Sequence, residues 1–190
     1  RESIEISYKP MPDVVRWNTH KSYLRVLEDR GVPTVPTLWL AAGSPVDLKA
    51  AMTERGWERG FIKPLVGATA RETLRFNRDP EGLDQAQAHV DRLLPIEDLM
   101  VQPYMASVET FGEVSALFID GRYSHGVRKV PVPGDYRVQD DWGATDEPYT
   151  FSDEEIGQLA GMLQGVDADL VYARCDLLRD SDGALRLIEL

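Results

Sequence analysis

The sequence predicts an α+β fold, in which antiparallel strands joined by tight turns are covered by amphipathic helices. Two Asp-Gly pairs, Asp120-Gly121 and Asp182-Gly183, each lie between two strand-like runs, which is the pattern of a two-residue β-hairpin. Apolar residues recur at helical spacing over 83–93. The order of signals is not that of a regular βαβ array, and no internal repeat is present. With 190 residues, the chain suits one large or two small domains.

The first half of the chain divides at residues with turn or capping chemistry. Tyr23, Val26 and Leu27 share one face of an expected helix over 19–30, and Gly31 is suited to end it. The other expected elements are, in order, an extended stretch over 32–40, a helix from an N-cap at Ser44-Pro45 to about residue 55, a strand around Lys63, a helix around 83–93 and a strand over 99–105.

The second half is expected to be dominated by hairpins. Ser152 and Glu155 have the spacing of a capping box and predict the start of a helix. The polar stretch 131–149, rich in Gly and Pro, predicts a long functional or mobile loop. The expected strands cover 111–119 and 122–130 in the first hairpin, and 170–178 and 184–190 in the last.

Composition narrows the classes of function. The 21 Lys and Arg against 32 Asp and Glu leave a net charge of −11, so nucleic acid and anionic membranes are not expected partners. No apolar run approaches the roughly 20 residues that span a bilayer, and no signal-peptide pattern is present. The single cysteine, Cys175, excludes an internal disulfide and a thiolate zinc cluster. We therefore expect a cytoplasmic enzyme or binding protein. Because the chain starts at Arg1 and stops within a strand-like run, we also expect it to be part of a longer protein.

Lys63 is the most informative residue, because it lies in the apolar run Phe61-Ile62-Lys63-Pro64. Burying an unpaired ammonium costs several kcal/mol, by order of magnitude, so a strand rarely contains one without a reason. The small residues over 65–70 leave backbone N–H groups open to an anion. A phosphate cradle is one interpretation, and a lysine whose stem packs while its ammonium reaches water is the other.

The last hairpin predicts a pair of facing acids. With Asp182-Gly183 as the turn, Asp176 lies opposite Glu189, and their Cβ atoms are expected to be roughly 5 Å apart. Like charges so placed are destabilising, and Mg²⁺, which prefers carboxylate ligands, would relieve the repulsion. The alternatives are a slipped register, a solvated acid, or neutralisation by Arg174 or Arg179.

The same register argument applied to the first hairpin places Glu113 opposite Arg128, with Ser115 on the same face. An ordinary cross-strand ion pair is sufficient to explain that contact. Lys129 is then expected on the other face, among apolar neighbours. In the loop that follows, Arg137 is the residue type that binds carboxylate or phosphate with two parallel hydrogen bonds, although a polar surface strand is a competing interpretation.

Taken together, these stretches resemble the ATP-grasp ligases, in particular the bacterial glutathione-synthetase-like branch and, within it, the cycloserine-forming cyclo-ligase type. The resemblance extends through nearly the whole chain. It is carried, in order, by residues 18–24, 61–64 with the loop after them, 101–105, 112–113, 128–139, and 174–176 with 188–189.

The resemblance implies a nucleotide bound between two α+β lobes of mainly antiparallel sheet, with ATP and Mg²⁺ as cofactors and an amino-acid-like substrate whose carboxylate is activated as an acyl phosphate. It implies a preceding-domain tail or linker at 1–17, a first lobe at 18–100 and a second at 101–190. Departures from the family are Ser115, where close relatives carry arginine, and Arg71 and Glu72 in a loop that usually has more glycine. The implied roles are ATP binding by Lys21, Lys63, Gln102, Tyr104, Met105, Glu113 and Lys129, catalysis by Lys129 and Arg137, and metal binding by Asp176 and Glu189.

Two other functions are left open by the sequence. One is an ATP-grasp kinase or other phosphotransferase that performs no ligation. The other is a nucleotide-binding module without catalysis. A homo-oligomer is also left open, since fold-level likeness does not determine partners or acceptors.

Overall fold

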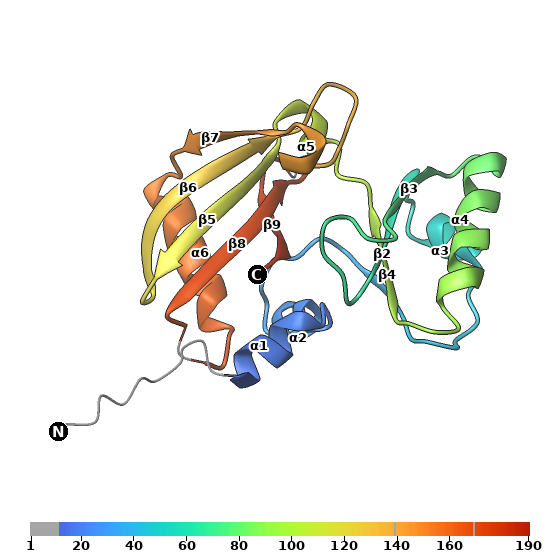
Figure 1. Cartoon of the computed structure of the whole chain (residues 1–190), viewed down its shortest axis with the longest axis horizontal. Coiled ribbons are helices and arrows are strands. Elements are labelled where there is room, and N and C mark those ends of the chain that lie inside the picture. Colours follow the sequence, from blue (N-terminus) through green and yellow to red (C-terminus); the bar gives the residue numbers. More distant parts are fainter. Residues whose placement is uncertain (1–11, 139, 169) are drawn as a thin grey trace.

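The computed structural model describes residues 12–138, 140–168 and 170–190. Gln139, the last residue of the expected arginine stretch, and most of the expected tail at 1–17 lie outside these ranges. The chain forms two antiparallel sheets, one four-stranded and one five-stranded, which stand side by side in Figure 1. The α+β class expected from the sequence is therefore confirmed.

The small lobe consists of the four-stranded sheet and the helices that cover it. Its strand order is β1-β4-β2-β3, and α3 and α4 pack together on one face (Figure 1). Its own hydrophobic core includes Ile62, Phe76, Val90 and Leu99. The elements are β1 (Leu38–Leu40), α3 (Leu48–Glu54), β2 (Arg59–Pro64), β3 (Leu74–Asn77), α4 (Pro80–Leu93) and β4 (Leu99–Pro103).

The large lobe consists of the five-stranded sheet, in the order β7-β6-β5-β8-β9, together with the helices that pack against it. Tyr23, Leu24 and Leu27 of α2 belong to the core of this lobe, along with Val114 and Leu177 of the sheet. The elements are α1 (Pro12–Thr19), α2 (Tyr23–Asp29), α5 (Ser107–Thr110), β5 (Glu113–Ile119), β6 (Arg122–Val130), the 3₁₀ turn η1 (Asp140–Trp142), β7 (Thr145–Tyr149), α6 (Asp153–Gln164), β8 (Tyr172–Arg179) and β9 (Leu185–Glu189).

Helix α2 joins the two halves of the chain, because it lies early in the sequence yet packs in the core of the large lobe (Figure 1). The backbone N–H of Lys21, just before α2, donates to the carbonyl of Leu65 at 2.8 Å. The segment before α2 is therefore attached to the small lobe while the helix itself is buried in the large one. The lobe boundaries at 18–100 and 101–190 remain a prediction.

The helix expected over 19–30 is shorter than predicted, which is a correction: α2 covers Tyr23–Asp29, and α1, which the sequence did not predict, ends at Thr19. The chain turns at residues 20–22, where the backbone of Lys21 bonds to Leu65 instead of continuing a helical ladder. The expected N-cap at Ser44 is also wrong: the Asp47 side chain accepts from the N–H of Ala50 at 2.9 Å, so α3 begins three residues later. The capping box of Ser152 and Glu155 is present as predicted.

The elements missed by the sequence analysis are short. They are α1, β3, α5, η1 and β7, and the last two lie inside the stretch expected to be a long loop. Their stability comes from pairing and packing, which local patterns do not reveal. In the described residues, no helix is both long enough and apolar enough to cross a membrane.

Candidate active site

A cleft between the two lobes contains most of the residues singled out from the sequence. It encloses about 960 Å³ free of protein atoms, part of it open to solvent. The small lobe contributes β2 and the loop after it, the end of β4 contributes residues 102 and 103, and the large lobe contributes the 136–138 segment and the end of β9. Eight of the predicted site residues line it: Lys21, Lys63, Gln102, Tyr104, Met105, Glu113, Arg137 and Glu189.

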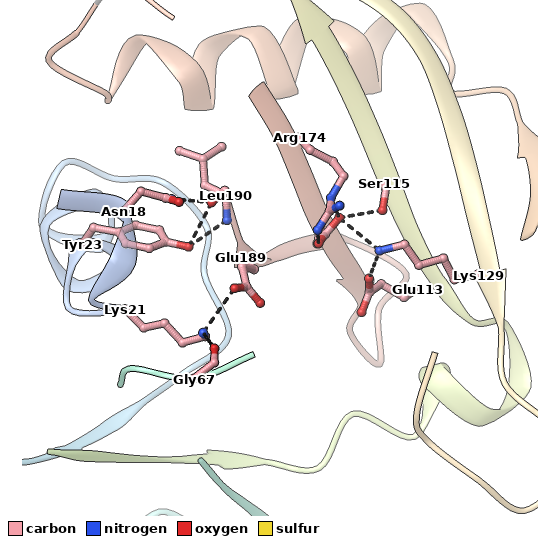
Figure 2. Close-up of polar contacts among 11 residues, drawn as sticks. Asn18, Lys21, Tyr23, Gly67, Glu113, Ser115, Lys129, Arg174, Glu189 and Leu190 are labelled. Carbon is pink, nitrogen blue, oxygen red and sulfur yellow. Dashed lines mark hydrogen bonds and ion pairs between the residues drawn. The ribbon is translucent and has the colours of Figure 1, made fainter. Parts of the chain in front are cut away.

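Lys21 is held at the centre of the cleft by both lobes. Only 6% of the residue is exposed. Its Nζ donates to the carbonyl of Gly67 at 2.8 Å and lies 3.2 Å from a carboxylate oxygen of Glu189, as Figure 2 shows. The lysine thus connects the small-residue loop after β2 to the last strand of the large lobe.

Lys63 differs from Lys21, because its ammonium forms no hydrogen bond or ion pair with any other residue that the structure describes. The pKa of Lys63 is lowered to about 8, chiefly because the side chain is buried; the charge of Lys21 also lowers it, while Glu189 and Glu113 oppose the shift. The strand position predicted for Lys63 is confirmed, in β2. A buried cation that the protein leaves unpaired is suited to an anionic ligand.

A cluster of charges lies next to the cleft on the face of the five-stranded sheet (Figure 2). The Lys129 ammonium lies 2.7 Å from Glu113 and 3.4 Å from Asp176. Asp176 also accepts from the Ser115 hydroxyl at 2.6 Å and from the Arg174 guanidinium at 2.9 and 2.7 Å. Burial raises the pKa of Glu113 to about 7, and the adjacent charge of Asp176 raises it as well. Burial alone would lower the pKa of Lys129, but its two acidic neighbours raise it overall.

The register expected for the first hairpin is wrong. Beyond a β-bulge that leaves Ser124 unpaired, Glu113 pairs with Lys129 and not with Arg128. Since one extra residue moves every later side chain to the other face, Lys129 points toward the acids instead of toward apolar neighbours. Arg128 bonds to Glu147 of β7 at 2.6 Å. The turn residues themselves, Asp120 and Gly121, both have positive φ, as a type I′ turn requires.

The last hairpin pairs Asp176 with Glu189, as predicted. The turn is one residue longer than expected, because the backbone of Asp180 bonds to that of Ala184 at 2.9 Å. A bulge at Ile188 adds one residue to β9, so the two deviations cancel at Asp176. Arg174 neutralises Asp176, which was one of the alternatives to a metal ion.

The candidate metal position consists of two acids, Asp176 and Glu189, and not of a larger cluster. No group of three or more His, Cys, Asp or Glu side chains gathers in a metal-binding arrangement within the described residues. Asp176 and Glu189 are carboxylates on neighbouring paired strands, and Mg²⁺ is commonly held by one or two carboxylates together with substrate phosphates. The residues present fit a magnesium ion that shares its coordination with a ligand.

Arg137 lines the cleft but is held from within its own segment. Its guanidinium is paired with Asp135, with contacts of 2.6 to 3.0 Å, and lies 3.5 Å from the centre of the Trp142 ring. The preceding residue, Tyr136, makes an edge contact with Phe61 of β2, with ring centres 5.0 Å apart. The sequence analysis missed this contact, which attaches the segment carrying Arg137 to the opposite lobe.

The predicted hinge residues follow β4 into the cleft. The Gln102 side chain donates to the Thr37 hydroxyl at 2.9 Å. The Tyr104 hydroxyl donates to Glu109, and the Arg59 guanidinium lies 4.1 Å from the centre of the Tyr104 ring. These contacts hold the rim of the cleft in place.

No protein-family model matches the chain. A curated relative, the cycloserine biosynthesis protein DcsG of Streptomyces lavendulae, is 34% identical over 197 residues, which cover 95% of this chain and 63% of the relative. The crystal structure of D-cycloserine synthetase DcsG superposes with a TM-score of 0.79 at 30% identity, covering 93% of this chain and 63% of that one. The ATP-grasp ligase PsnB, complexed with a phosphomimetic precursor variant, Mg and ADP, gives a TM-score of 0.67 at 22% identity, covering 94% of this chain and 51% of that one. The chain thus spans less than two thirds of the proteins it matches.

Proposed function

Because the chain shares the fold of a solved ATP-grasp ligase, we propose that it belongs to that family and is the nucleotide-binding part of an ATP- and Mg²⁺-dependent ligase. In this reaction the γ-phosphoryl group of ATP passes to a substrate carboxylate, and an amine or related nucleophile attacks the acyl phosphate. A carbon–nitrogen bond forms and ADP and phosphate are released. The observation that carries the proposal is the convergence of Lys21, Lys63 and Arg137 on the cleft that also contains Glu189.

The lysines are assigned to the nucleotide phosphates. Within the described ranges, the Lys63 ammonium has no hydrogen-bond or ion-pair partner, and Lys21 lies beside the small-residue loop whose backbone faces the cleft. Phosphoryl transfer demands little covalent chemistry from the protein, so positioning and charge supply most of the lowering of the barrier. Lys129 and Arg137 are assigned to the transferred group, although each is paired with an acid in this structure.

The base and sugar are assigned to the rim and to Glu113. Gln102, Tyr104 and Met105 line the part of the cleft where the chain passes from one lobe to the other. Glu113 lines the cleft from β5 and carries the carboxylate that would accept from the ribose hydroxyls. These assignments rest on the resemblance to the family together with the position of each side chain at the cleft.

Asp176 and Glu189 are assigned to the metal. When bound, Mg²⁺ supplies neutralisation of the charge that develops on the terminal phosphates. The chain's own contribution is to hold the two carboxylates on paired strands and to keep Glu189 against Lys21. The Asp176→Asn variant is expected to lose the Mg²⁺ dependence of turnover.

The substrate class is proposed from the curated relative. The 34% identity to a cycloserine biosynthesis protein supports a small amino-acid-like carboxylate. Within that class, the acceptor site remains a prediction, as do a cytoplasmic location and the homo-oligomer that the sequence leaves open.

The test is a screen of phosphate and ADP release from ATP·Mg²⁺ with pairs of amino-acid-like acceptors. A ligase releases both products only when the carboxylate and the nucleophile are present together. A stable phosphorylated product from one acceptor would replace the proposal with a kinase. Binding of ATP·Mg²⁺ without turnover under any pairing would replace it with a binding module.

A further inference from the structure

Asp176 is already fully engaged by protein donors. One carboxylate oxygen, Oδ1, accepts from Ser115 at 2.6 Å and from Nε of Arg174 at 2.9 Å, and it also lies 3.4 Å from the Lys129 ammonium. The other oxygen, Oδ2, accepts from Nη2 of Arg174 at 2.7 Å. The side chain is only 6% exposed. A metal ion therefore meets a carboxylate whose two oxygens are both hydrogen-bonded.

Glu189, the acid paired with it, is different. Its side chain is 46% exposed, and its one ion-pair partner in the described part of the chain is Lys21, at 3.2 Å. Glu189 also lines the cleft, whereas Asp176 lies behind the lining. Glu189, which faces the cleft, is therefore accessible to a cation. The carboxylate oxygens of Asp176 are instead occupied by hydrogen bonds from Arg174.

We infer that Arg174 is an internal counter-ion of the metal position, which a divalent cation must displace from Asp176 when it binds. The inference deepens the proposed function and rests on it. Arg174 is then a positioning residue: it orients the Asp176 carboxylate while no metal is bound, and it moves away when the metal binds.

The geometry distinguishes Arg174 from the other donors. Its side chain is 46% exposed, so it has room to swing into solvent. Lys129 is 18% exposed and is also held by Glu113, so it stays in place. Ser115 is neutral, and its hydroxyl is able to keep donating to Asp176 beside a metal. Arg174 is therefore the donor whose departure opens Asp176 without leaving Glu113 unpaired.

If Arg174 and the metal compete for Asp176, removing the arginine should strengthen metal binding. A bidentate Arg–carboxylate pair is among the stronger hydrogen-bonded contacts, so displacing it opposes metal binding. In nucleotide-free protein, Arg174→Gln is expected to bind Mn²⁺ about tenfold more tightly than the unmodified chain. The Mn²⁺ ion serves as the probe, and its free concentration is read from its electron paramagnetic resonance signal. Arg174→Lys keeps the positive charge but loses the bidentate guanidinium. Its Mn²⁺ affinity is expected to lie between those of the unmodified chain and Arg174→Gln.

A matched control breaks a similar pair away from the cleft. Arg186 is 36% exposed and binds Asp180 at 2.8 Å near the turn of the same hairpin. Arg186→Gln is expected to leave Mn²⁺ affinity unchanged. Adding Asp176→Asn to Arg174→Gln is expected to abolish the gain, which shows that the tighter binding is at Asp176. Should Arg174→Gln fail to fold, Arg174→Lys provides the same comparison.

Two negative results have different meanings. Suppose that both Arg174 variants bind Mn²⁺ no more tightly than the unmodified chain but bind ATP·Mn²⁺ normally. This result overturns the displacement of Arg174 by the metal and leaves the proposed function unaffected. Absence of Mn²⁺ binding in every protein, with and without ATP, overturns both.

Discussion

Lys63 and Lys129 are both partly buried lysines on strands beside the same cleft, yet their surroundings are opposite. The ammonium of Lys129 has two acidic partners, Glu113 and Asp176, and its pKa is raised. The ammonium of Lys63 has no hydrogen-bond or ion-pair partner among the described residues, and burial lowers its pKa to about 8. The ammonium of Lys129 is paired within the protein, and we propose that an anionic ligand pairs with the ammonium of Lys63.

We therefore expect paired charges such as Lys129 to stabilise the fold, and the unpaired charge of Lys63 to contribute to ligand binding instead. Removing one partner of a buried ion pair leaves an uncompensated charge and is costly, whereas removing an unpaired buried charge is not. Stability and ligand affinity should therefore respond in opposite ways at the two positions.

The largest expected effect is the loss of stability in Lys129→Met. Glu113 and Asp176 would then face each other without the ammonium that lies between them, and the free energy of unfolding is expected to fall by about 3–5 kcal/mol. Chemical denaturation measures this. Arg128→Met is the control, because its pair with Glu147 is more exposed and is expected to cost about 1 kcal/mol or less. A loss at Lys129 no larger than that at Arg128 would mean that the cluster is not a structural unit.

Next in size is the loss of nucleotide affinity in Lys63→Met. Binding of ATP is expected to weaken by about 1.5–3 kcal/mol, the size of a charged hydrogen bond, while the ligand-free protein keeps or gains stability. Calorimetric titration and denaturation of the same variant measure the two quantities. Lys49→Met, on the exposed face of α3, controls for the loss of one positive charge. Equal ATP affinity in the two variants would remove Lys63 from the site.

Glu113 is expected to make the stability of the protein depend on pH. Burial holds the Glu113 pKa at about 7, above its usual value of 4.5, so the folded state binds the proton more tightly than the unfolded state. Stability is therefore lost as the pH rises from about 4.5 through 7. Glu113→Gln is expected to remove this slope, as shown by thermal melts across that range. Parallel pH profiles for the two proteins would indicate that Glu113 titrates normally.

The smallest expected effect is at the aromatic contact between the lobes. An aromatic pair contributes about 0.5–1.5 kcal/mol beyond its buried area, so Tyr136→Leu should raise the KM for ATP by roughly 2- to 10-fold. Tyr136→Phe keeps the ring and is expected to behave like the unmodified chain. If Tyr136→Phe were as impaired as Tyr136→Leu, the hydroxyl and not the contact with Phe61 would be responsible.

Local chemistry made much of the fold predictable. The Asp120-Gly121 turn, the Ser152 capping box and the strand that carries Lys63 each follow from a few adjacent residues. The ATP-grasp fold implied by the resemblance is confirmed by the solved structures, and the resemblance to the cycloserine-forming type agrees with the similarity to DcsG.

The errors in hairpin register depended on single inserted residues. The position of Lys129 was wrong because a bulge at Ser124 reverses the faces, and a bulge has no reliable sequence signal. The pairing of Asp176 with Glu189 was correct because a longer turn and a second bulge cancel. The ion pair between Arg174 and Asp176 was one of several alternatives to a metal ion in the sequence analysis. The folded structure was needed to choose among them.

The most direct measurement is a crystal structure of the chain with a non-hydrolysable ATP analogue and Mg²⁺. We predict that the triphosphate lies in the cleft within hydrogen-bond distance of Lys21 and Lys63, with the metal ion on Glu189 and Asp176. A nucleotide bound elsewhere, or one in the cleft that leaves Lys63 without a phosphate contact, would contradict the proposed site.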